Sequence, residues 1–396
     1  MSGPRQWPHR ERRRLYTPDR DSESTAARGA YLVGLNLGGE PTYVSEEHLD
    51  ELGELVDSCG GRVVGRALQR RQSPDPRTFI GGGKAREIGE AAKAEGADLV
   101  IFDDDLSPGQ AKNLEQVMEL PVLDRSSLIL EIFERRARSR EARTQVELAR
   151  LRYTLPRLTR MWSHLSRQVG GIGVRGGAGE TQLETDRRIL RQRIKKLEKD
   201  LAKIERTRTV QRRRRGQLPV VALAGYTNAG KTTLFQRLTG ARVQGEDRLF
   251  ATLDARLRRG ALTPEQIVVF GDTVGFIRKL PHHLVSSFRS TLEELVEADV
   301  VLHVVDRSHE AWEEQQRLAE EVLEELGVDP DRILTVYNKM DLLPEGTSLP
   351  EGATLGISAA TGQGLDTLRA TLSRRLFPAF PIDVDTTPSA RYNPPA

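Results

Sequence analysis

The sequence predicts an α/β fold in which two domains of alternating strands and helices flank a basic helical hairpin. The chain has 396 residues, whereas one domain usually takes roughly 100–200, so we expect two or three domains. Apolar runs of strand length alternate with stretches of helical periodicity on both sides of the middle of the chain. Residues 135–215 carry 25 Lys and Arg but only 8 Asp and Glu, although the whole chain has a net charge of +3.

The composition excludes several classes of protein. Hydrophobic residues make up 37% of the chain, but no apolar run approaches the roughly 18–20 residues of a membrane span. The single cysteine, Cys59, excludes an internal disulfide framework and a zinc–thiolate cluster, and we expect it to be buried. Residues 1–28 contain seven arginines and no apolar stretch, which predicts a disordered basic tail rather than a secretory signal. We therefore expect a cytoplasmic protein without a membrane span.

Residues 29–136 are predicted to form an N-terminal α/β domain with a mainly parallel sheet, because strands and helices alternate there. The expected strands are Tyr31–Leu37, Arg62–Arg70, Asp98–Phe102 and Pro121–Leu123, and the expected helices are Ser45–Ser58, Lys84–Glu95 and Ser107–Met118. We find no convincing catalytic set in this domain. The Gly81–Lys84 segment lacks the flanking glycine and the trailing Ser or Thr of a phosphate-binding loop, but a second nucleotide site there is kept as an alternative.

Residues 137–216 are predicted to form a basic helical linker. Apolar residues recur at helical spacing from Leu128 to Leu158, and a second apolar stripe follows residues 180–215. The loop Gly170–Gly179 contains six glycines and joins the two helices into a hairpin; it is either a passive connector or, through Arg175, a phosphate contact. Residues 135–215 carry a charge of +17 against −14 for the rest, which favours a phosphate-rich partner over a merely solvated helix face.

Residues 217–377 again alternate strands with helices, which predicts a doubly wound α/β domain. The expected strands are Leu218–Leu223, Ile267–Phe270, Asp299–Val305, Ile333–Tyr337 and Thr354–Ile357. Helices are expected between them, including the amphipathic run Trp312–Leu326. Residues 378–396 show no clear element and are expected to be a short C-terminal tail.

A phosphate-binding loop lies between the first of these strands and the following helix. The sequence matches G-x-x-x-x-G-K-[ST] in the strand-to-helix context that the motif requires. The motif comprises Gly225, Tyr226, Thr227, Asn228, Ala229, Gly230, Lys231 and Thr232, and Thr233, the next residue of the expected helix, is included in the candidate site. We expect backbone N–H groups to close around phosphates there, the Lys231 ammonium to reach the β- and γ-phosphates, and the Thr232 hydroxyl to ligate Mg²⁺.

A second motif follows the strand Ile267–Phe270. Its residues are Asp272, Thr273, Val274 and Gly275. A carboxylate at the carboxyl end of a strand beside a phosphate-binding loop suits the metal, and the Gly275 amide suits a γ-phosphate. Thr252 is the candidate for the threonine that senses both the Mg²⁺ ion and the γ-phosphate. Phe276 stands where many related proteins have a glutamine that positions the attacking water, so hydrolysis is expected to be slow alone or completed by another group.

A third motif selects the base. Asn338, Lys339 and Asp341 fit N-x-x-D spacing after the strand Ile333–Tyr337, and the Ser358–Ala359 pair follows the last expected strand. A carboxylate at position 341 accepts hydrogen bonds from N1 and N2 of guanine, whereas adenine offers neither proton. A backbone N–H at 358–359 suits guanine O6. The set therefore predicts a GTPase rather than an ATPase, on a Ras-like fold.

These motifs resemble one family over about Ala30–Leu376. The resemblance rests on G-Y-T-N-A-G-K-T in the phosphate-binding loop, F-A-T-L-D at Phe250–Asp254, D-T-V-G-F at Asp272–Phe276 and G-E-T-Q-L-E-T-D at Gly179–Asp186. Further similar stretches are Phe79–Lys84, Asp103–Glu115, Gln145–Leu158 and Gly170–Gly173. The chain is similar to the HflX family, in the Obg–HflX group of translation-factor-related GTPases. It departs from that family's pattern at Gly176–Gly179.

The resemblance implies a ribosome-associated GTPase that binds the large ribosomal subunit and its RNA and splits or rescues stalled ribosomes. We expect a monomer with a catalytic set of Lys231, Asn228, Thr252 and Gly275, Mg²⁺ held by Thr232, Thr252 and Asp272, and K⁺ as a second candidate cation at Asn228. Two alternatives stay open. The GTPase could serve another RNA process, such as tRNA modification or subunit assembly, or the chain could be an RNA-binding protein with a regulatory nucleotide site.

Overall fold

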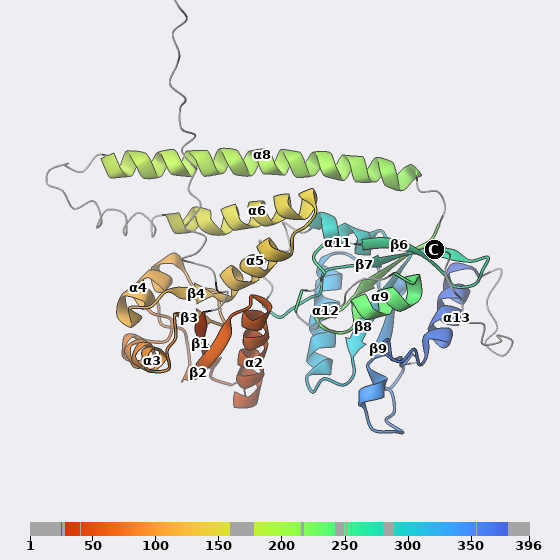
Figure 1. The fold of residues 1–396 in the computed structure, drawn as a ribbon, viewed down its shortest axis with the longest axis horizontal. Helices are drawn as coiled ribbons and strands as arrows, with labels where there is room; N and C mark the ends of the chain where they lie inside the picture. The colour runs from red at the N-terminus through yellow and green to blue at the C-terminus, as the bar shows by residue number, and fades with distance from the viewer. Residues whose placement is uncertain are drawn as a thin grey trace, which may run out of the picture.

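The structure is a computed structural model of the full chain (Figure 1). It describes Thr25, Arg28 and residues 29–39, 41–158, 178–214, 218–241, 249–250, 252–254, 256–279, 289–353 and 355–378. Most of the predicted N-terminal tail, the Gly170–Gly177 part of the loop and the predicted C-terminal tail beyond residue 378 lie outside the described residues.

The N-terminal part contains a four-stranded parallel sheet in the order β2-β1-β3-β4. Its elements are β1 (Gly29–Leu37), α2 (Thr42–Ser58), β2 (Arg62–Arg71), α3 (Gly82–Ala94), β3 (Leu99–Phe102), α4 (Pro108–Met118) and β4 (Val122–Asp124). Alternate residues of β1 enter different cores. Leu32 packs with α2, whereas Val33 packs with α3 and α4. The predicted parallel α/β layer is therefore confirmed.

The hairpin is formed by α6 (Arg140–Thr154) and α8 (Ala178–Arg214), which run side by side, and α8 extends above both sheets in the view of Figure 1. The stretch 128–158, where apolar residues recur at helical spacing, contains two helices, because α5 (Arg125–Arg136) ends before Ala137 and a new helix begins after Ser139. The Ser139 side chain accepts the backbone N–H of Ala142 at 3.0 Å, which caps α6. A short 3-10 turn, η1 (Leu155–Arg157), follows.

Ion pairs between described residues connect the hairpin helices. Arg193 contacts Glu147 at 2.6 Å, and Arg152 contacts Glu198 at 2.9 Å. Leu197 of α8 is buried between them. The predicted helical hairpin is confirmed, and its apolar stripe explains how so highly charged a helix is held in place.

The C-terminal part contains a five-stranded sheet in the order β6-β7-β5-β8-β9, in which only β6 is antiparallel to its neighbour. Its strands are β5 (Val220–Ala224), β6 (Arg256–Ala261), β7 (Ile267–Asp272), β8 (Val300–Asp306) and β9 (Ile333–Asn338). Its helices are α9 (Lys231–Thr239), α11 (Arg289–Val296), α12 (Trp312–Glu325) and α13 (Leu365–Leu376), with 3-10 turns η2 (Pro330–Arg332) and η3 (Met340–Leu342).

Two strand expectations need correction. The edge strand β6 was not expected, because Arg258 and Arg259 interrupt its apolar alternation. Of the expected strand Thr354–Ile357, Thr354 lies outside the described residues. The rest pairs with β9 only through an isolated parallel bridge between Gly356 and Tyr337, so it is not a strand of the sheet. Helices α9 and α13 cover one face of this sheet, and α11 and α12 cover the other, as a doubly wound domain requires.

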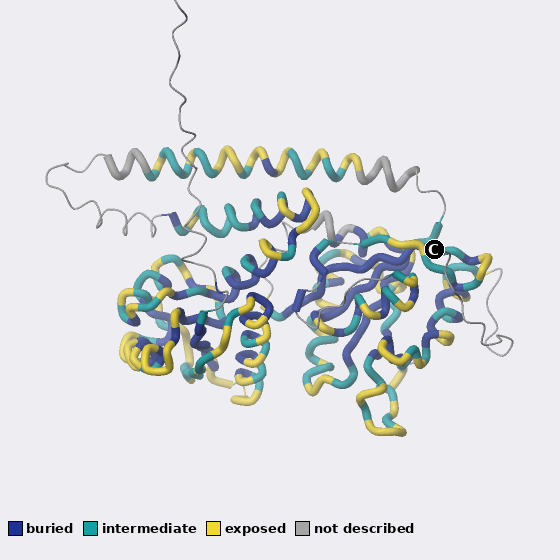
Figure 2. The backbone as a smooth tube through the Cα atoms, in the orientation of Figure 1, coloured by how far each residue is buried: buried dark blue, intermediate teal, exposed yellow. Residues whose placement is uncertain are grey.

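The two sheets are joined through a shared apolar cluster. Phe133 of α5 meets Phe250, which precedes β6, with ring centroids 4.8 Å apart and planes at 86°. Figure 2 shows the inner strands of both sheets as mostly buried, whereas the edge strands β2 and β6 are intermediate or exposed. Within the part of the chain that the structure describes, no helix combines the length and apolar character that crossing a membrane requires.

Candidate nucleotide-binding site

The predicted phosphate-binding loop joins β5 to α9, with backbone conformations that suit close approach of a ligand. Gly225 has φ 138° and Gly230 has φ 90°, both in the region that favours glycine. A Cβ atom at Gly225 would lie 2.2 Å from the Val304 carbonyl oxygen, and one at Gly230 would lie 2.2 Å from Nδ2 of Asn338. Both motif glycines are therefore required by packing as well as by the loop's conformation.

Lys231 lies at the centre of this loop, and its side chain is buried. Its Nζ donates to the Gly225 carbonyl oxygen at 3.0 Å and also to the Tyr226 carbonyl oxygen. Burial lowers the pKa of Lys231 to about 8, while Asp272 acts in the opposite direction. Two phosphate groups in the loop would take the place of the carbonyl acceptors and stabilise the charged form.

Three predicted metal ligands converge from three separate segments. The Thr232 and Thr252 hydroxyl oxygens are 3.0 Å apart, and they donate to Oδ2 of Asp272 at 3.0 and 2.8 Å. Among the described residues, Oδ1 of Asp272 is a buried atom without a hydrogen-bond partner. Burial raises the pKa of Asp272, only partly offset by Thr252 and Lys231, and a cation bound beside it would stabilise the charged carboxylate. The donor set of hydroxyl and carboxylate oxygens fits Mg²⁺.

The segment after Asp272 runs directly over the phosphate-binding loop. Thr273 donates its hydroxyl to the Leu223 carbonyl oxygen at 2.7 Å, which fixes the end of β7. Phe276 forms a β-bridge with Tyr226 and is 1% exposed. The Phe276 ring is therefore core, and it cannot orient a water molecule. A Cβ at Gly275 would lie 2.8 Å from the Thr227 Cα, so only glycine lets this amide approach the loop.

Asn338 connects two segments of the predicted base-recognition set. Its Nδ2 donates to the Ala229 carbonyl oxygen at 2.8 Å, and its Oδ1 accepts the Ala359 N–H at 2.9 Å. Asn338 thereby links the phosphate-binding loop with the Ser358–Ala359 turn. The Lys339 side chain contacts Asp306 at 2.7 Å, and Asp341 lies exposed in η3. The sequence-based reasoning missed Asp306, although a carboxylate at the end of β8 was a usable signal.

We expect Asp341→Asn to weaken GDP binding and to admit xanthine nucleotides. The carboxylate would accept two hydrogen bonds from guanine, whereas an amide offers one acceptor, and losing such a bond costs about 1.5–3 kcal/mol. Titration of Asp341→Asn and of the unmodified protein with GDP and XDP measures the change in nucleotide preference. Asp331→Asn, in the exposed turn η2, is the matched control. Unchanged GDP affinity without a gain for XDP would refute the assignment of Asp341.

A second group that sequence reasoning missed connects the loop with the N-terminal sheet. The Tyr226 hydroxyl donates to the Glu51 carboxylate of α2 and accepts the Arg278 N–H at 2.8 Å. Arg125 pairs with Glu51 and, at 2.6 Å, with Asp103. Lys279 contacts Asp103 at 2.7 Å. No sequence motif marked these positions, because the partners lie far apart along the chain.

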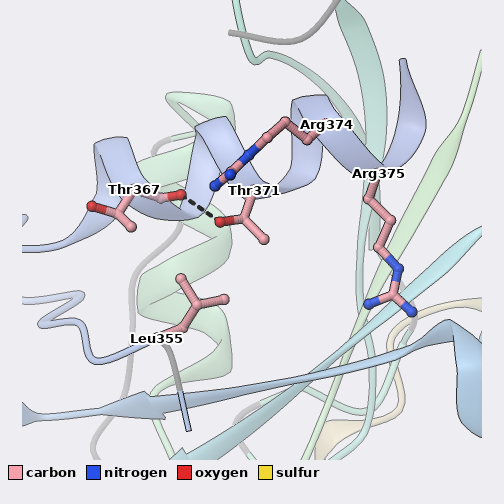
Figure 3. Close-up of a pocket in the computed structure, with 5 residues that line it drawn as sticks. All are labelled: Leu355, Thr367, Thr371, Arg374 and Arg375. Atoms are coloured by element: carbon pink, nitrogen blue, oxygen red, sulfur yellow. Dashed lines mark hydrogen bonds between the residues drawn. The ribbon is translucent and has the colours of Figure 1, made fainter. Parts of the chain in front are cut away.

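A hollow beside α13 is separate from the site just described. It is lined by Leu355, Thr367, Thr371, Arg374 and Arg375 (Figure 3). The Thr371 hydroxyl donates to the Thr367 carbonyl oxygen at 2.9 Å, so this side chain is engaged within its own helix. None of the predicted nucleotide-binding residues lines this hollow.

Three family models match consecutive parts of the chain. They are described as GTP-binding GTPase N-terminal (residues 46–134), GTP-binding GTPase Middle Region (residues 136–215) and 50S ribosome-binding GTPase (residues 220–339). A solved structure of a GTP-binding protein from Sulfolobus solfataricus in complex with GDP is 24% identical, with a TM-score of 0.46, and the match covers 89% of this chain and 100% of that one.

Curated relatives match over most of their length. GTPase HflX of Magnetococcus marinus is 48% identical over 332 residues, 82% of this chain and 77% of that protein. GTPase HflX of Escherichia coli is 46% identical over 338 residues, 83% of this chain and 79% of that protein. With the phosphate-binding loop, the base-recognition residues and the family models in agreement, the chain belongs to the HflX family of GTPases, enzymes that hydrolyse GTP.

Proposed function

We propose that this GTPase requires Mg²⁺, binds the large ribosomal subunit in the cytoplasm and uses the GTP cycle to split or rescue stalled ribosomes. We further propose that it acts as a monomer, with an α/β domain at 29–136, a basic linker at 137–216 and a GTPase domain at 217–377, between tails at 1–28 and 378–396. The match of residues 220–339 to a family described as 50S ribosome-binding GTPase supports the choice of partner.

The observation that carries the ribosomal proposal is a row of basic side chains on α8. Arg188, Arg191, Lys195, Lys199 and Arg206 are all exposed. Their spacing of three, four, four and seven residues places them on one side of the helix. Over 18 residues this row extends about 27 Å.

The opposite side of α8 faces α6. Leu197 is buried there, and the Glu147–Arg193 and Arg152–Glu198 pairs fasten the two helices. Figure 2 shows exposed and partly buried stretches alternating along α8. A straight row of cations on a supported helix suits the regular phosphates of ribosomal RNA, which bind through charge neutralisation. A solvated surface helix needs no such one-sided arrangement.

We propose the following task for each of these residues of the site. Lys231 would neutralise charge between the β- and γ-phosphates, the Gly275 amide would bind the γ-phosphate, and Asp341 would select guanine. Thr232, Thr252 and Asp272 would hold Mg²⁺, which supplies charge neutralisation at the phosphates when it is bound. The buried, unpaired Oδ1 of Asp272 supports this metal assignment.

Co-sedimentation with large ribosomal subunits tests the proposed partner. We expect retention with a non-hydrolysable GTP analogue and release with GDP, since the proposed cycle uses the γ-phosphate to control ribosome affinity. Retention that is equal with GTP analogue, GDP and no nucleotide would instead support an RNA-binding protein with a regulatory site. No retention in any state would support a GTPase of another RNA process.

We also propose that Asn228 holds K⁺ beside the phosphates. Asn228 has φ 61° and is exposed at the tip of the loop, where its amide oxygen is free to turn toward the ligand. Because Phe276 cannot act on the water, a monovalent cation would supply the charge neutralisation that an arginine finger supplies elsewhere.

We expect GTP hydrolysis to be faster in KCl than in NaCl at equal ionic strength, with the difference lost in Asn228→Ala. Single-turnover rates in both salts, with and without large ribosomal subunits, measure it. Asn113→Ala, on α4, is the matched control, since that amide donates to Arg77 in the N-terminal part. Equal rates in the two salts would leave Asn228 a structural residue of the loop.

A further inference from the structure

Asp254 connects the candidate metal site with the helical hairpin. It lies two residues after Thr252, and its Oδ2 accepts the backbone N–H groups of Arg138 and Ser139 at 3.1 Å each. Its Oδ1 accepts the Ser139 hydroxyl. These three donors form the N-terminal end of α6, where Ser139 is also the capping residue. A carboxylate of the GTPase part thus binds the positive end of a hairpin helix.

Apolar contacts hold the same segment against the same helices. The Phe250 ring packs edge-on against Phe133 of α5. Leu249 and Leu253 are buried in the apolar cluster that also contains Val146 of α6. The described residues from 249 to 254 therefore present both apolar and charged groups to α5 and α6. A segment docked in this way has a defined position rather than a range of positions.

We propose that Asp254 is a positioning residue for the GTPase reaction, which holds Thr252 at the metal by docking its segment on the N-terminus of α6. The inference rests on the proposed role of Thr252 as a Mg²⁺ ligand. In the docked arrangement the Thr252 hydroxyl lies 2.8 Å from Asp272 and 3.0 Å from Thr232. Undocking of Asp254 would free the backbone two residues away and move this hydroxyl from the site.

The proposal makes docking and GTP binding mutually favourable. GDP lacks the γ-phosphate, so its binding gains less from a correctly placed Thr252 than GTP binding does. By thermodynamic linkage, GTP with Mg²⁺ must then strengthen the contact between Asp254 and α6 by the same factor. Because α6 is paired with α8, the docked segment also joins the nucleotide site to the hairpin that carries the basic row.

Asp254→Ala and Ser139→Ala test the proposal, with Ser107→Ala as the matched control. Ser107 caps α4 as Ser139 caps α6, through a 3.2 Å bond to the Gln110 N–H, and it makes this cap within the N-terminal part. We expect both test variants to bind a Mg²⁺-bound, non-hydrolysable GTP analogue about tenfold more weakly, and GDP within about twofold of the unmodified protein. The control should change neither affinity.

Hydrogen exchange supplies a readout that is independent of affinity. The Arg138 and Ser139 amides should exchange more slowly with the Mg²⁺-bound GTP analogue than with GDP, and Asp254→Ala should abolish this difference. An unchanged ratio of analogue to GDP affinity in Asp254→Ala would overturn the inference, whether both affinities stay the same or fall by the same factor. Thr252→Ala distinguishes the role of Thr252 from that of Asp254. If Thr252→Ala leaves the affinity for the GTP analogue unchanged, the proposed role of Thr252 is wrong. If Thr252→Ala weakens analogue binding but Asp254→Ala does not, only the positioning role of Asp254 is wrong.

Discussion

Replacing Lys231 with alanine should reduce the single-turnover rate of GTP hydrolysis about 10²–10³-fold, as expected for losing one preorganised charge donor at the phosphates. The ammonium is buried in the loop, where phosphates would take the place of the Gly225 and Tyr226 carbonyl oxygens that it now contacts. Rates at saturating GTP separate this catalytic loss from weakened binding, which GDP titration measures directly.

Lys84→Ala is the control for this variant. Lys84 also follows glycines, in the Gly81–Lys84 segment, but it is paired with Glu87 at 2.5 Å within α3. We expect unchanged GTP hydrolysis and an unchanged number of bound nucleotides. A Lys231→Ala protein that still hydrolyses GTP at the original rate would place catalysis elsewhere. A lost second nucleotide in Lys84→Ala would instead establish a separate site in the N-terminal part.

The second large effect is expected in stability, from Arg125→Met. Arg125 is 1% exposed and pairs with both Glu51 and Asp103. Burial acts to lower the pKa of Arg125, but the two carboxylates outweigh it and raise that pKa above its usual value. Removing one member of a buried ionic group typically costs about 3–5 kcal/mol. Because Lys279 still pairs with Asp103 and Arg278 with Glu51, we expect the lower end of this range.

Urea unfolding of the N-terminal part measures this cost, and Arg66→Met provides the comparison. Arg66 pairs with Asp50 on the protein surface, where such a pair contributes about 0–1 kcal/mol. If Arg125→Met costs no more than Arg66→Met, the buried group does not stabilise the protein. We also expect Arg125→Met/Asp103→Asn to cost less than the sum of its two single variants, because it leaves fewer unpaired charges.

Much of the nucleotide site follows from local sequence. The loop Gly225–Thr232 combines backbone freedom, amide donors and a lysine within eight consecutive positions, so its chemistry does not depend on distant residues. Strand–helix alternation also depends on neighbouring residues, and it predicted the two α/β layers with mainly parallel sheets. The edge strand β6 was not predicted, because its arginines interrupt the alternation of apolar and polar residues. The helix cap Ser139 was not predicted either, because a capping residue between two helices leaves the pattern of apolar residues unchanged.

The sequence by itself determined the GTPase motifs, the order of α/β layers and the excess of positive charge in the hairpin, because each depends on neighbouring residues or composition. Only the tertiary structure decided which residues bind across the parts of the chain. Tyr226 meets Glu51 across 175 positions, and Asp254 meets Ser139 across 115. Such contacts carry no spacing rule, since they depend on how two independently patterned layers pack. The link between the nucleotide site and the hairpin is therefore a property of the packed chain.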